Sequence, residues 1–397
     1  METASQAMSA LAALDIAIYV GSMTLFLTAL RKSRRAPRRP LDRAAAVTIF
    51  KPLAGNDDEL AANLESFAAL DYPCFEILLG VASTEDPAYV VARDFVRRNK
   101  HVRARVVLTD RNAAQNPKVA QLLELSRQAR GELFVISDSN VRVPKDYLWS
   151  LLSEISRPGV GLVTSVFAGS GETTLGAALE NLQLASVVAP AVVLSTMLTN
   201  RPFTIGKSMA MWKRDLAEIG GFSAVGDVLA EDHVLGDRFK AAGYSLRTSF
   251  GMIQNRNVDC STRRTLERHA RWAKIRRSLS PHAFLLEPLG SPVVIAFLLF
   301  LLSPSRTLFF CVAASAALQS IFAFASVRIL RGKSLAIRYA PLEVARAFAI
   351  FGCWLWALLS DRVVWRGNPF RILPGSRIVP ASPRLFARRR SLRLASK

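Results

Sequence analysis

The sequence predicts an α/β fold with a Rossmann-like, mostly parallel sheet, attached to a membrane by hydrophobic helices at both ends of the chain. Between residues 45 and 282, short apolar runs alternate with longer amphipathic segments, the pattern of βαβ units. A strongly apolar segment precedes this region, and the C-terminal third is apolar again. We therefore divide the chain into an N-terminal anchor with a basic linker (1–44), an α/β domain (45–282), a membrane region (283–361) and a basic tail (362–397).

Composition favours a membrane protein over a nucleic-acid-binding protein. Of the 397 residues, 51% are hydrophobic, and the formal net charge is +21. The excess of arginine and lysine lies beside the hydrophobic segments and in the tail, where anionic lipid headgroups would meet it. The sequence has no zinc-finger spacing and no RNA-binding motif, so we expect contact with an anionic lipid surface and no nucleic-acid partner. Its four cysteines show no CxxC or paired spacing.

The first apolar segment, Leu11 to Leu30, is long enough to span the hydrocarbon core and contains Asp15 as its only charge. A cleaved signal peptide is the alternative interpretation. No basic residue precedes this segment, whereas the basic stretch from Arg31 to Arg43 follows it, which favours a retained anchor. The positive flank predicts that the α/β domain faces the cytosol, at the inner membrane if the protein is bacterial.

Three further segments in the C-terminal third are candidate membrane helices. They are Ala283 to Leu302, Arg306 to Val327 and Tyr339 to Ser360. Three crossings would place the basic tail outside, although its arginines and its lack of acidic residues predict the cytosolic side. Because Glu343 and Arg346 fall within the last segment, we expect a re-entrant or interfacial helix there.

The α/β domain is expected to begin with four strands separated by helices. The predicted strands are Val47 to Phe50, Phe75 to Val81, Ala104 to Leu108 and Leu133 to Ile136. Helical spacing of apolar residues marks 58–70, 88–99 and 117–129 between them. In an open parallel sheet, ligands bind beyond the carboxyl ends of the strands, so candidate site residues are expected there.

The fourth predicted strand is followed directly by Ser137-Asp138-Ser139-Asn140. Asp138 therefore has the position of a ligand-binding residue, and its carboxylate together with the Asn140 amide could hold a Mg²⁺ ion. A turn or a helix N-cap is the structural alternative, because Asp, Ser and Asn are all favoured there. This motif alone does not decide between the two interpretations.

A second acidic motif, Glu231-Asp232-His233, lies far downstream, before a helical run from Leu235 to Ala242. Asp232 is a candidate general base, because group transfer to a hydroxyl requires a residue that takes its proton. His233 is a candidate second metal ligand beside Asp138. The structural alternative for the whole motif is an acidic first helical turn that complements the helix dipole.

A basic and aromatic cluster runs from Arg268 to Trp272. Helical spacing places Arg268 and Arg271 on one face, where both could bind a diphosphate, and leaves the Trp272 indole for a sugar or a lipid. A solvated or membrane-facing basic helix is the alternative. Lys207 lies in a Gly-Lys-Ser turn that resembles part of a phosphate loop, but the GxxxxGK(S/T) spacing is missing, so we reject a Walker A site.

Taken together and in this order, these motifs resemble the GT-A glycosyltransferases of the ceramide glucosyltransferase kind, which are close to the hopanoid-associated glycosyltransferases. The resemblance covers residues 47–281, and the hydrophobic ends of the chain fit the same architecture. It implies a GT-A fold and an inverting transfer of a sugar from a UDP-sugar, assisted by Mg²⁺ or Mn²⁺.

The resemblance also implies roles for individual residues. Lys51 and Pro52 match the family's first strand and turn, Asp86 its first aspartate, and Lys118 a segment that contacts the nucleotide. Asp138 matches the second aspartate, Asp232 the third aspartate and base, and Arg268, Arg271 and Trp272 the terminal (Q/R)xxRW signature. Two departures stand out. The segment before Asp86 is poor in aspartate, and Asp138-Ser139-Asn140 lacks the second aspartate of a DxD motif, which leaves Asp138 with His233, or the diphosphate itself, to hold a metal.

We therefore expect a membrane enzyme that transfers a sugar to a lipid hydroxyl, with UDP-glucose as the first choice of donor and ceramide as the first choice of acceptor. The basic cluster beside membrane segments favours a lipid acceptor. The alternatives are a hopanoid-associated N-acetylglucosaminyltransferase or another lipid glycosyltransferase, a processive polysaccharide synthase and an inactive membrane scaffold. A synthase usually has more spanning helices, and a scaffold would not need Asp138, Asp232, Arg271 and Trp272 all to be present.

Overall fold

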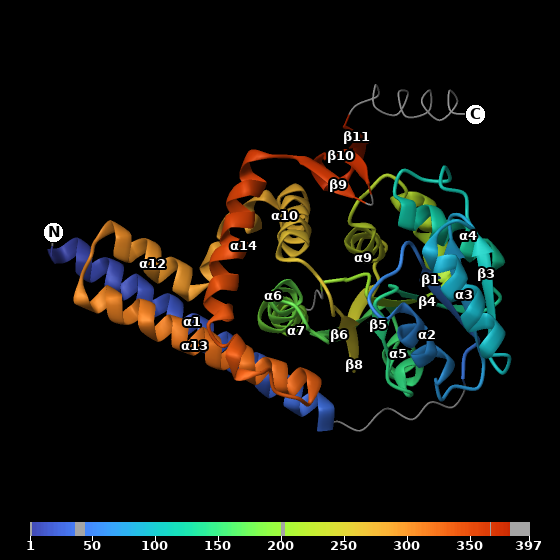
Figure 1. The fold of residues 1–397 in the computed structure, drawn as a ribbon, viewed down its shortest axis with the longest axis horizontal. Helices are drawn as coiled ribbons and strands as arrows, with labels where there is room; N and C mark the ends of the chain where they lie inside the picture. Colours follow the sequence, from blue (N-terminus) through green and yellow to red (C-terminus); the bar gives the residue numbers. More distant parts are fainter. Residues whose placement is uncertain (1, 36–43, 200–202, 366, 382–397) are drawn as a thin grey trace.

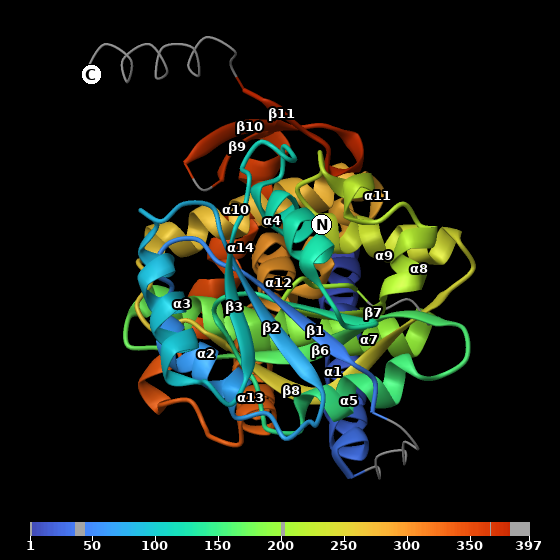
Figure 2. The same cartoon turned by 90° about the vertical axis from the view of Figure 1, so that its right-hand side faces the viewer.

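The computed structural model describes residues 2–35, 44–199, 203–365 and 367–381 and is shown in two views in Figures 1 and 2. Most of the predicted basic linker, residues 36–43, lies outside this description. So do the tail arginines Arg384 and Arg388 to Arg390.

In the described part of the chain, eight strands form one sheet in the order β3-β2-β1-β4-β7-β6-β8-β5. Its first four strands are parallel, β7 is antiparallel to both of its neighbours, and β6 and β8 are again parallel. The mostly parallel sheet and its first four strands are confirmed. The bounds are β1 (Val47–Pro52), β2 (Phe75–Val81), β3 (Arg103–Leu108), β4 (Leu133–Ser137), β5 (Val141–Arg142), β6 (Val160–Ser170), β7 (Ser208–Trp212) and β8 (Ser245–Arg256).

Helices cover both faces of the parallel half of this sheet. One face packs against α2 (Leu60–Ala68), α3 (Pro87–Arg98) and α5 (Tyr147–Ile155). The other face packs against α4 (Pro117–Gln128), the 3₁₀ turn η2 (Phe222–Val225) and α9 (Glu231–Ala241). The short helix α8 (Lys213–Glu218) follows β7.

The starts of α3 and α4 follow directly from their sequences. Asp86 caps α3 by accepting from Ala88 N, and Asn116 caps α4 by accepting from Lys118 N and Val119 N. A proline occupies the first helical position in both helices, where its missing N–H costs no hydrogen bond.

A helical layer packs on the long strand β6 together with the membrane helices. It consists of α6 (Leu175–Gln183), the π-helical turn η1 (Leu184–Val188) and α7 (Ala189–Thr199). Side chains of β6 alternate, so that Val163 and Phe167 join the core beneath α5, whereas Val166 and Ala168 pack with this layer. The helix α10 (Thr262–Leu279) packs against α6 and lies above it in the view of Figure 1.

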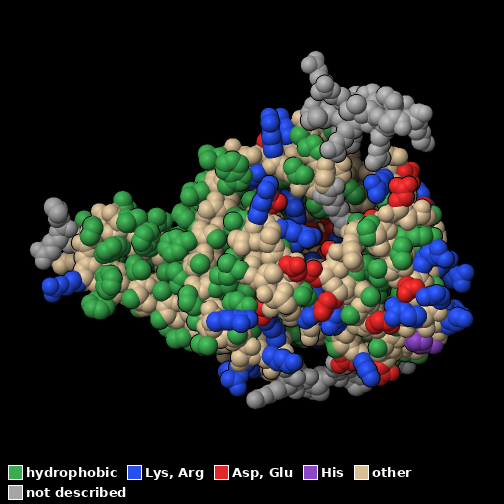
Figure 3. Space-filling view, viewed as in Figure 1, with side chains coloured by type: hydrophobic (Ala, Val, Ile, Leu, Met, Phe, Trp, Pro, Cys, Tyr) green, Lys and Arg blue, Asp and Glu red, His purple; other side chains and the backbone are tan. Residues whose placement is uncertain are grey.

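The predicted N-terminal membrane helix and two of the three predicted C-terminal ones are confirmed as helices of suitable length and apolarity. The helices α1 (Glu2–Arg35), α12 (Pro292–Leu302) and α13 (Arg306–Arg331) form an elongated lobe (Figure 1). Hydrophobic side chains cover this lobe, as Figure 3 shows. Among the described residues, four helical segments are long and apolar enough to span a membrane: Thr3–Ser33, Leu175–Thr199, Arg306–Arg331 and Ile337–Leu359.

The structure differs from the sequence interpretation in where a span is broken. The helical segments 281–290 and 292–302 meet at a bend of 84°. The broken or re-entrant segment therefore lies in the first predicted C-terminal membrane helix, Ala283 to Leu302. In the last candidate, α14 (Leu342–Leu359) is continuous, because Glu343 and Arg346 pair with each other inside the protein at 2.6 Å. This helix lies across the lobe rather than along it (Figure 1). The bent segment contains α11 (Pro281–Leu286) and η3 (Glu287–Gly290), and η4 (Ile337–Tyr339) precedes α14.

Residues 362–380 form a small antiparallel sheet where the sequence suggested only a basic tail. The sheet consists of β9 (Arg362–Trp365), β10 (Asn368–Ile372) and β11 (Ile378–Pro380), with a 3₁₀ turn η5 (Pro374–Ser376). It folds because Val363, Phe370, Ile372 and Ile378 bury their side chains against Leu229 of the α/β domain. The described part of the predicted tail thus belongs to the folded domain.

Candidate functional site

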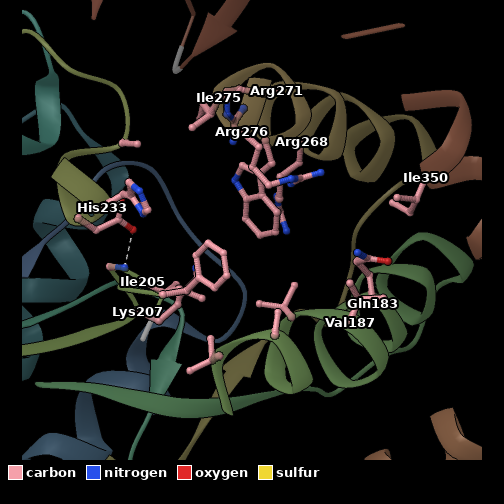
Figure 4. A pocket seen from close by; sticks show the side chains of 18 of the residues that line it. Gln183, Val187, Ile205, Lys207, His233, Arg268, Arg271, Ile275, Arg276 and Ile350 are labelled. Carbon is pink, nitrogen blue, oxygen red and sulfur yellow. Dashed lines mark hydrogen bonds between the residues drawn. The ribbon is translucent and has the colours of Figure 1, made fainter. Parts of the chain in front are cut away.

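A cavity of about 700 Å³ lies between the strand ends and the membrane-region helices. Figure 3 shows charged side chains gathered around a hollow between the apolar lobe and the α/β domain. One end of the cavity, the charged end, is lined by Lys118, Asp138, Lys207, Glu231, Asp232 and Arg271. The other end, the apolar end, is lined mainly by Val187, Ala191, Phe284, Val294, Ile350 and Phe351, with the bonded pair Gln183 and Arg346 among them. Figure 4 shows Lys207 and His233 on the side away from Gln183 and Ile350.

Strand register brings Asp138 and Lys207 together. Ser137, the last residue of β4, pairs with Ser208, the first residue of the antiparallel β7, so the residues just outside this pair face each other. Lys207 Nζ lies 3.1 Å from Asp138 Oδ2, and Lys118 Nζ lies 2.9 Å from Asp138 Oδ1. Asp138 therefore lies at the strand end predicted from the sequence, with a lysine on each of its carboxylate oxygens.

The start of α4 links Asp138 to the second acidic motif. Lys118 Nζ also lies 2.8 Å from Glu231 Oε1. Asn116 donates through its amide to Val228 O at 2.7 Å and to Glu231 Oε2 at 3.2 Å, while its oxygen caps α4. The Asn-Pro-Lys sequence thus starts a helix and fixes the acidic motif with the same three residues.

Mutual pairing sets the protonation states of this cluster. Burial favours the neutral form of Asp138, but Lys118 and Lys207 outweigh it and hold the pKa of Asp138 well below its usual range. Burial also disfavours the Lys118 ammonium, yet the surrounding carboxylates raise its pKa above its usual value. Burial, with a further contribution from Asp232, raises the pKa of Glu231.

Asp232 is held in a fixed orientation by backbone groups. Its Oδ2 accepts from Gly206 N at 2.7 Å, its Oδ1 accepts from His233 N at 2.8 Å, and its carbonyl accepts from Thr204 Oγ1 at 2.9 Å. A Cβ atom at Gly206 would lie 2.6 Å from Lys118 Nζ, so a larger residue there would push the lysine ammonium out of its present position. The helix α9 begins at Glu231, so the motif forms an acidic first turn and also lines the cavity.

The two predicted metal ligands do not come together with further donors. Both oxygens of Asp138 face lysines, and His233 Nε2 lies 3.5 Å from Asp237 Oδ2, one turn along α9. Across the ranges that the structure describes, no group of three or more His, Cys, Asp or Glu side chains could hold a metal ion. These side chains do not fit a Mg²⁺ or Mn²⁺ site built from protein ligands alone. The positive charge beside Asp138 comes from Lys118 and Lys207.

Three of the five residues predicted to bind the nucleotide, Lys51, Pro52 and Asp86, lie at the end of β1 or after β2. Lys51 is fully buried in β1 and donates to Asp138 O and to Ser137 Oγ, with its ammonium 4.1 Å from the centre of the Phe67 ring. Burial lowers the pKa of Lys51 to about 7. Pro52 lines the cavity. Asp86 accepts from Gly55 N at 2.8 Å and thus holds the turn after β1, but it is not part of the cavity wall.

The helix α10 brings Arg268, Arg271 and Trp272 to the cavity, as Figure 4 shows for the two arginines. Arg268 Nη1 lies 3.0 Å from Glu180 Oε1 of α6, and His269 Nε2 lies 2.9 Å from Glu180 Oε2. This buried cluster fixes α10 against α6. The His269 and Trp272 rings pack edge to face with 5.1 Å between their centroids, which orients the indole.

Several residues of this site were not identified from the sequence. Lys207 was considered only as part of a Walker A loop, and Glu231 received no role of its own. Glu180 and Gln183 gave no signal at all, because they lie in a segment whose composition is that of an apolar helix. Their proximity to α10 depends on contacts about 90 residues apart, such as the 89-residue separation of Glu180 and His269.

Two solved structures resemble this chain at low sequence identity. The mannosyltransferase PcManGT from Pyrobaculum calidifontis, in complex with GDP-Man and Mn²⁺, is 18% identical and covers 88% of this chain and 99% of its own, with a TM-score of 0.49. TarS 1-349 of S. aureus, in complex with UDP-GlcNAc, is 12% identical and covers 85% and 99%, with a TM-score of 0.39.

Sequence comparison identifies the family. Residues 13–378 match glycosyl transferase family 21. Ceramide glucosyltransferase 1 of Caenorhabditis elegans is 26% identical over 344 residues, which cover 84% of this chain and 72% of that protein. Ceramide glucosyltransferase 3 of the same organism is 27% identical over 347 residues, covering 84% and 74%. The family match and the observed sheet confirm the GT-A-like fold, and the chain belongs to glycosyl transferase family 21 as a ceramide glucosyltransferase-like glycosyltransferase.

Proposed function

We propose that this enzyme transfers a sugar, with glucose as the first choice, from a UDP-sugar to the hydroxyl of a membrane lipid, with ceramide as the first choice. The observation that carries this proposal is one cavity whose charged end lies at the strand ends and whose apolar end lies between membrane-region helices. A nucleotide-sugar suits the first end and a lipid the second. The related ceramide glucosyltransferases support the same pair of substrates.

At the charged end, the residues supply the two tasks that sugar transfer requires. Lys118, Lys207 and Arg271 offer positive charge to the diphosphate, which must leave as UDP when the bond between the sugar C1 and the phosphate oxygen breaks. Asp232 takes the proton of the attacking hydroxyl as the new C1–O bond forms on the opposite face of the sugar. This single displacement inverts the anomeric configuration. The hydrogen bonds to Asp232 hold its carboxylate in place for this role.

At the apolar end, the wall consists of side chains from η1, α11, α12 and α14. A lipid can enter such a chamber from the membrane while its hydroxyl group reaches Asp232. The predicted cytosolic location of the α/β domain, at the inner membrane if the protein is bacterial, would give access to UDP-sugars. The basic flanks would face anionic lipid headgroups.

An assay with a defined panel of substrates tests this proposal. Purified protein in detergent is incubated with labelled UDP-glucose, UDP-galactose or UDP-N-acetylglucosamine, each against ceramide, diacylglycerol or a hopanoid polyol. We expect glucosylceramide with inverted, β anomeric configuration, identified by mass spectrometry and by digestion with an anomer-specific glucosidase. A product on the hopanoid alone would instead support the hopanoid-associated alternative. Absence of any glycosylated lipid would overturn the proposal.

A further inference from the structure

A buried glutamine lies among the apolar walls of the cavity. Gln183 is the last residue of α6, directly before the π-helical turn η1, and only 6% of its surface is exposed. π-Helical turns occur often at functional sites, because they shift side chains out of regular helical register. Figure 4 shows Gln183 and Val187 on one wall of the cavity and Ile350 on another.

The contacts of Gln183 fix which way its amide points. Its Oε1 accepts from Arg346 Nη1 of α14. A guanidinium group only donates, so this contact identifies the oxygen and leaves the NH₂ group on the other side. Arg346 is itself held by Glu343 through two hydrogen bonds, of 2.9 Å from Nε and 2.6 Å from Nη2. The amide of Gln183 is therefore locked in orientation by a buried ion pair.

Gln183 lines the cavity, and no described residue accepts a hydrogen bond from its NH₂ group. In the empty cavity water can pair with this donor, but a lipid that fills the cavity would displace that water, and leaving the donor unpaired would then cost free energy. A purely hydrocarbon ligand would impose this cost. A ligand with an oxygen at this point would avoid it.

We propose that Gln183 is a specificity-determining residue, whose Nε2 donates to the amide carbonyl oxygen of the lipid acceptor. This inference rests on the proposed function and deepens it. An amide carbonyl is a stronger acceptor than an ester carbonyl, and it lies a few bonds from the reacting hydroxyl of an N-acylated amino alcohol lipid. Arg346 and Glu343 act as positioning residues that hold the glutamine amide toward the acceptor.

Two substitutions separate the donor role of Gln183 from its structural role. Gln183→Glu keeps an oxygen for Arg346 but removes the NH₂ donor, whereas Gln183→Met keeps the size of the side chain and removes both polar groups. Gln319→Met is the matched control. It changes an equally buried glutamine, 2% exposed, that accepts from Val293 N at 2.8 Å and does not line the cavity.

The test compares ceramide with an isostere in which two methylene groups replace the amide, using UDP-glucose as donor. We expect wild-type kcat/KM to be at least about tenfold higher for ceramide, and both Gln183 variants to lose at least about tenfold on ceramide, mainly through KM. Turnover of the isostere, the KM for UDP-glucose and the slow hydrolysis of UDP-glucose should stay unchanged. Gln319→Met should preserve the preference for ceramide.

Each outcome bears on the inference. Equal use of both lipids by the wild type, or an equal loss on both lipids in the Gln183 variants, would overturn the role of Gln183 while leaving lipid glycosylation intact. If the wild type glycosylated neither lipid, the proposed function itself would fail, and the inference with it. Melting temperatures of all variants identify any that lose activity through unfolding.

Discussion

The two ends of the cavity are built on different principles. At the charged end, Lys118, Asp138, Lys207 and Glu231 form a chain of ion pairs whose positions are set by strand register and by helix caps. At the apolar end, η1 supplies Val187 and α14 supplies Ile350 and Phe351, while Gln183 and its partner Arg346 provide polar groups. In the proposed function, this difference in polarity would direct the diphosphate to one end and the lipid to the other.

One element belongs to both ends. The helix α10 contributes Arg271 and Trp272 near the charged cluster, and Ile275 and Leu279 further along the same cavity. It is fixed to α6 through Glu180, so the arginines and the apolar wall keep a constant relative position. In the proposed function, this fixed arrangement would present the lipid hydroxyl to the sugar.

Removing the base at the charged end should have the largest effect. We expect Asp232→Asn to lower kcat by about 100-fold or more, because the hydroxyl loses its proton acceptor, while UDP-glucose binding persists. Transfer rates and donor affinity by calorimetry measure the two effects separately. Asp237→Asn, on the exposed side of the same helix, serves as control and should stay near wild type. Unchanged turnover in Asp232→Asn would refute its assignment as base.

Removing the positive charge of Arg271 at the charged end should slow transfer less than removing the base. We expect Arg271→Ala to lose about 2 to 4 kcal/mol of transition-state stabilisation, because the departing diphosphate loses a cationic partner. The effect should appear in kcat more than in the KM for the donor. Arg263→Ala, which removes an exposed arginine of the same helix, is the control. Equal losses in the two variants would contradict a specific role for Arg271.

The charged end is also the part that could be predicted from the sequence. Asp138 follows an apolar strand, and a carboxylate there must lie at the ligand-binding edge of a parallel sheet. The regular spacing of Arg268 and Arg271 predicts a shared helical face. The pairing of Lys207 with Asp138 was not predicted, because it depends on β7 being antiparallel, and no local pattern before β7 indicates strand direction.

The apolar end could not be predicted, because its residues look like ordinary membrane-helix residues. The segment Leu175–Thr199 is apolar enough to span a membrane, so its sequence does not reveal that it lines a cavity. Likewise, Glu343 and Arg346 in a hydrophobic segment suggested an interfacial helix, but a buried ion pair satisfies both charges. The small sheet at 362–380 was not predicted, because its arginines suggested a basic tail. Its alternating apolar residues make the packing contacts.

Filling the apolar end should separate acceptor binding from donor binding. We expect Val187→Trp to raise the KM for ceramide by about tenfold, since the larger side chain would fill part of the cavity that the lipid is proposed to occupy. The KM for UDP-glucose should not change. Leu198→Trp adds the same ring to an exposed site, 68% accessible, on α7 and should leave both constants near wild type. A change in the donor KM of Val187→Trp would show that the two ends are not independent.

Replacing Lys51, which lies beneath the charged end, should give the smallest effect. It should change the pH dependence of the free energy of unfolding. Burial lowers the pKa of Lys51 to about 7, below its unfolded value of 10.5. Between these two pH values Lys51 is protonated in the unfolded chain and neutral in the folded protein. Folding therefore releases a proton, and the free energy of unfolding must rise with pH. From pH 7.5 to 8.5, we expect the wild type to gain about 1 kcal/mol of unfolding free energy relative to Lys51→Met, which has no such proton. Melting temperatures in detergent should show this as a relative shift of about 2 °C, and parallel pH profiles of the two proteins would mean that Lys51 stays charged when buried.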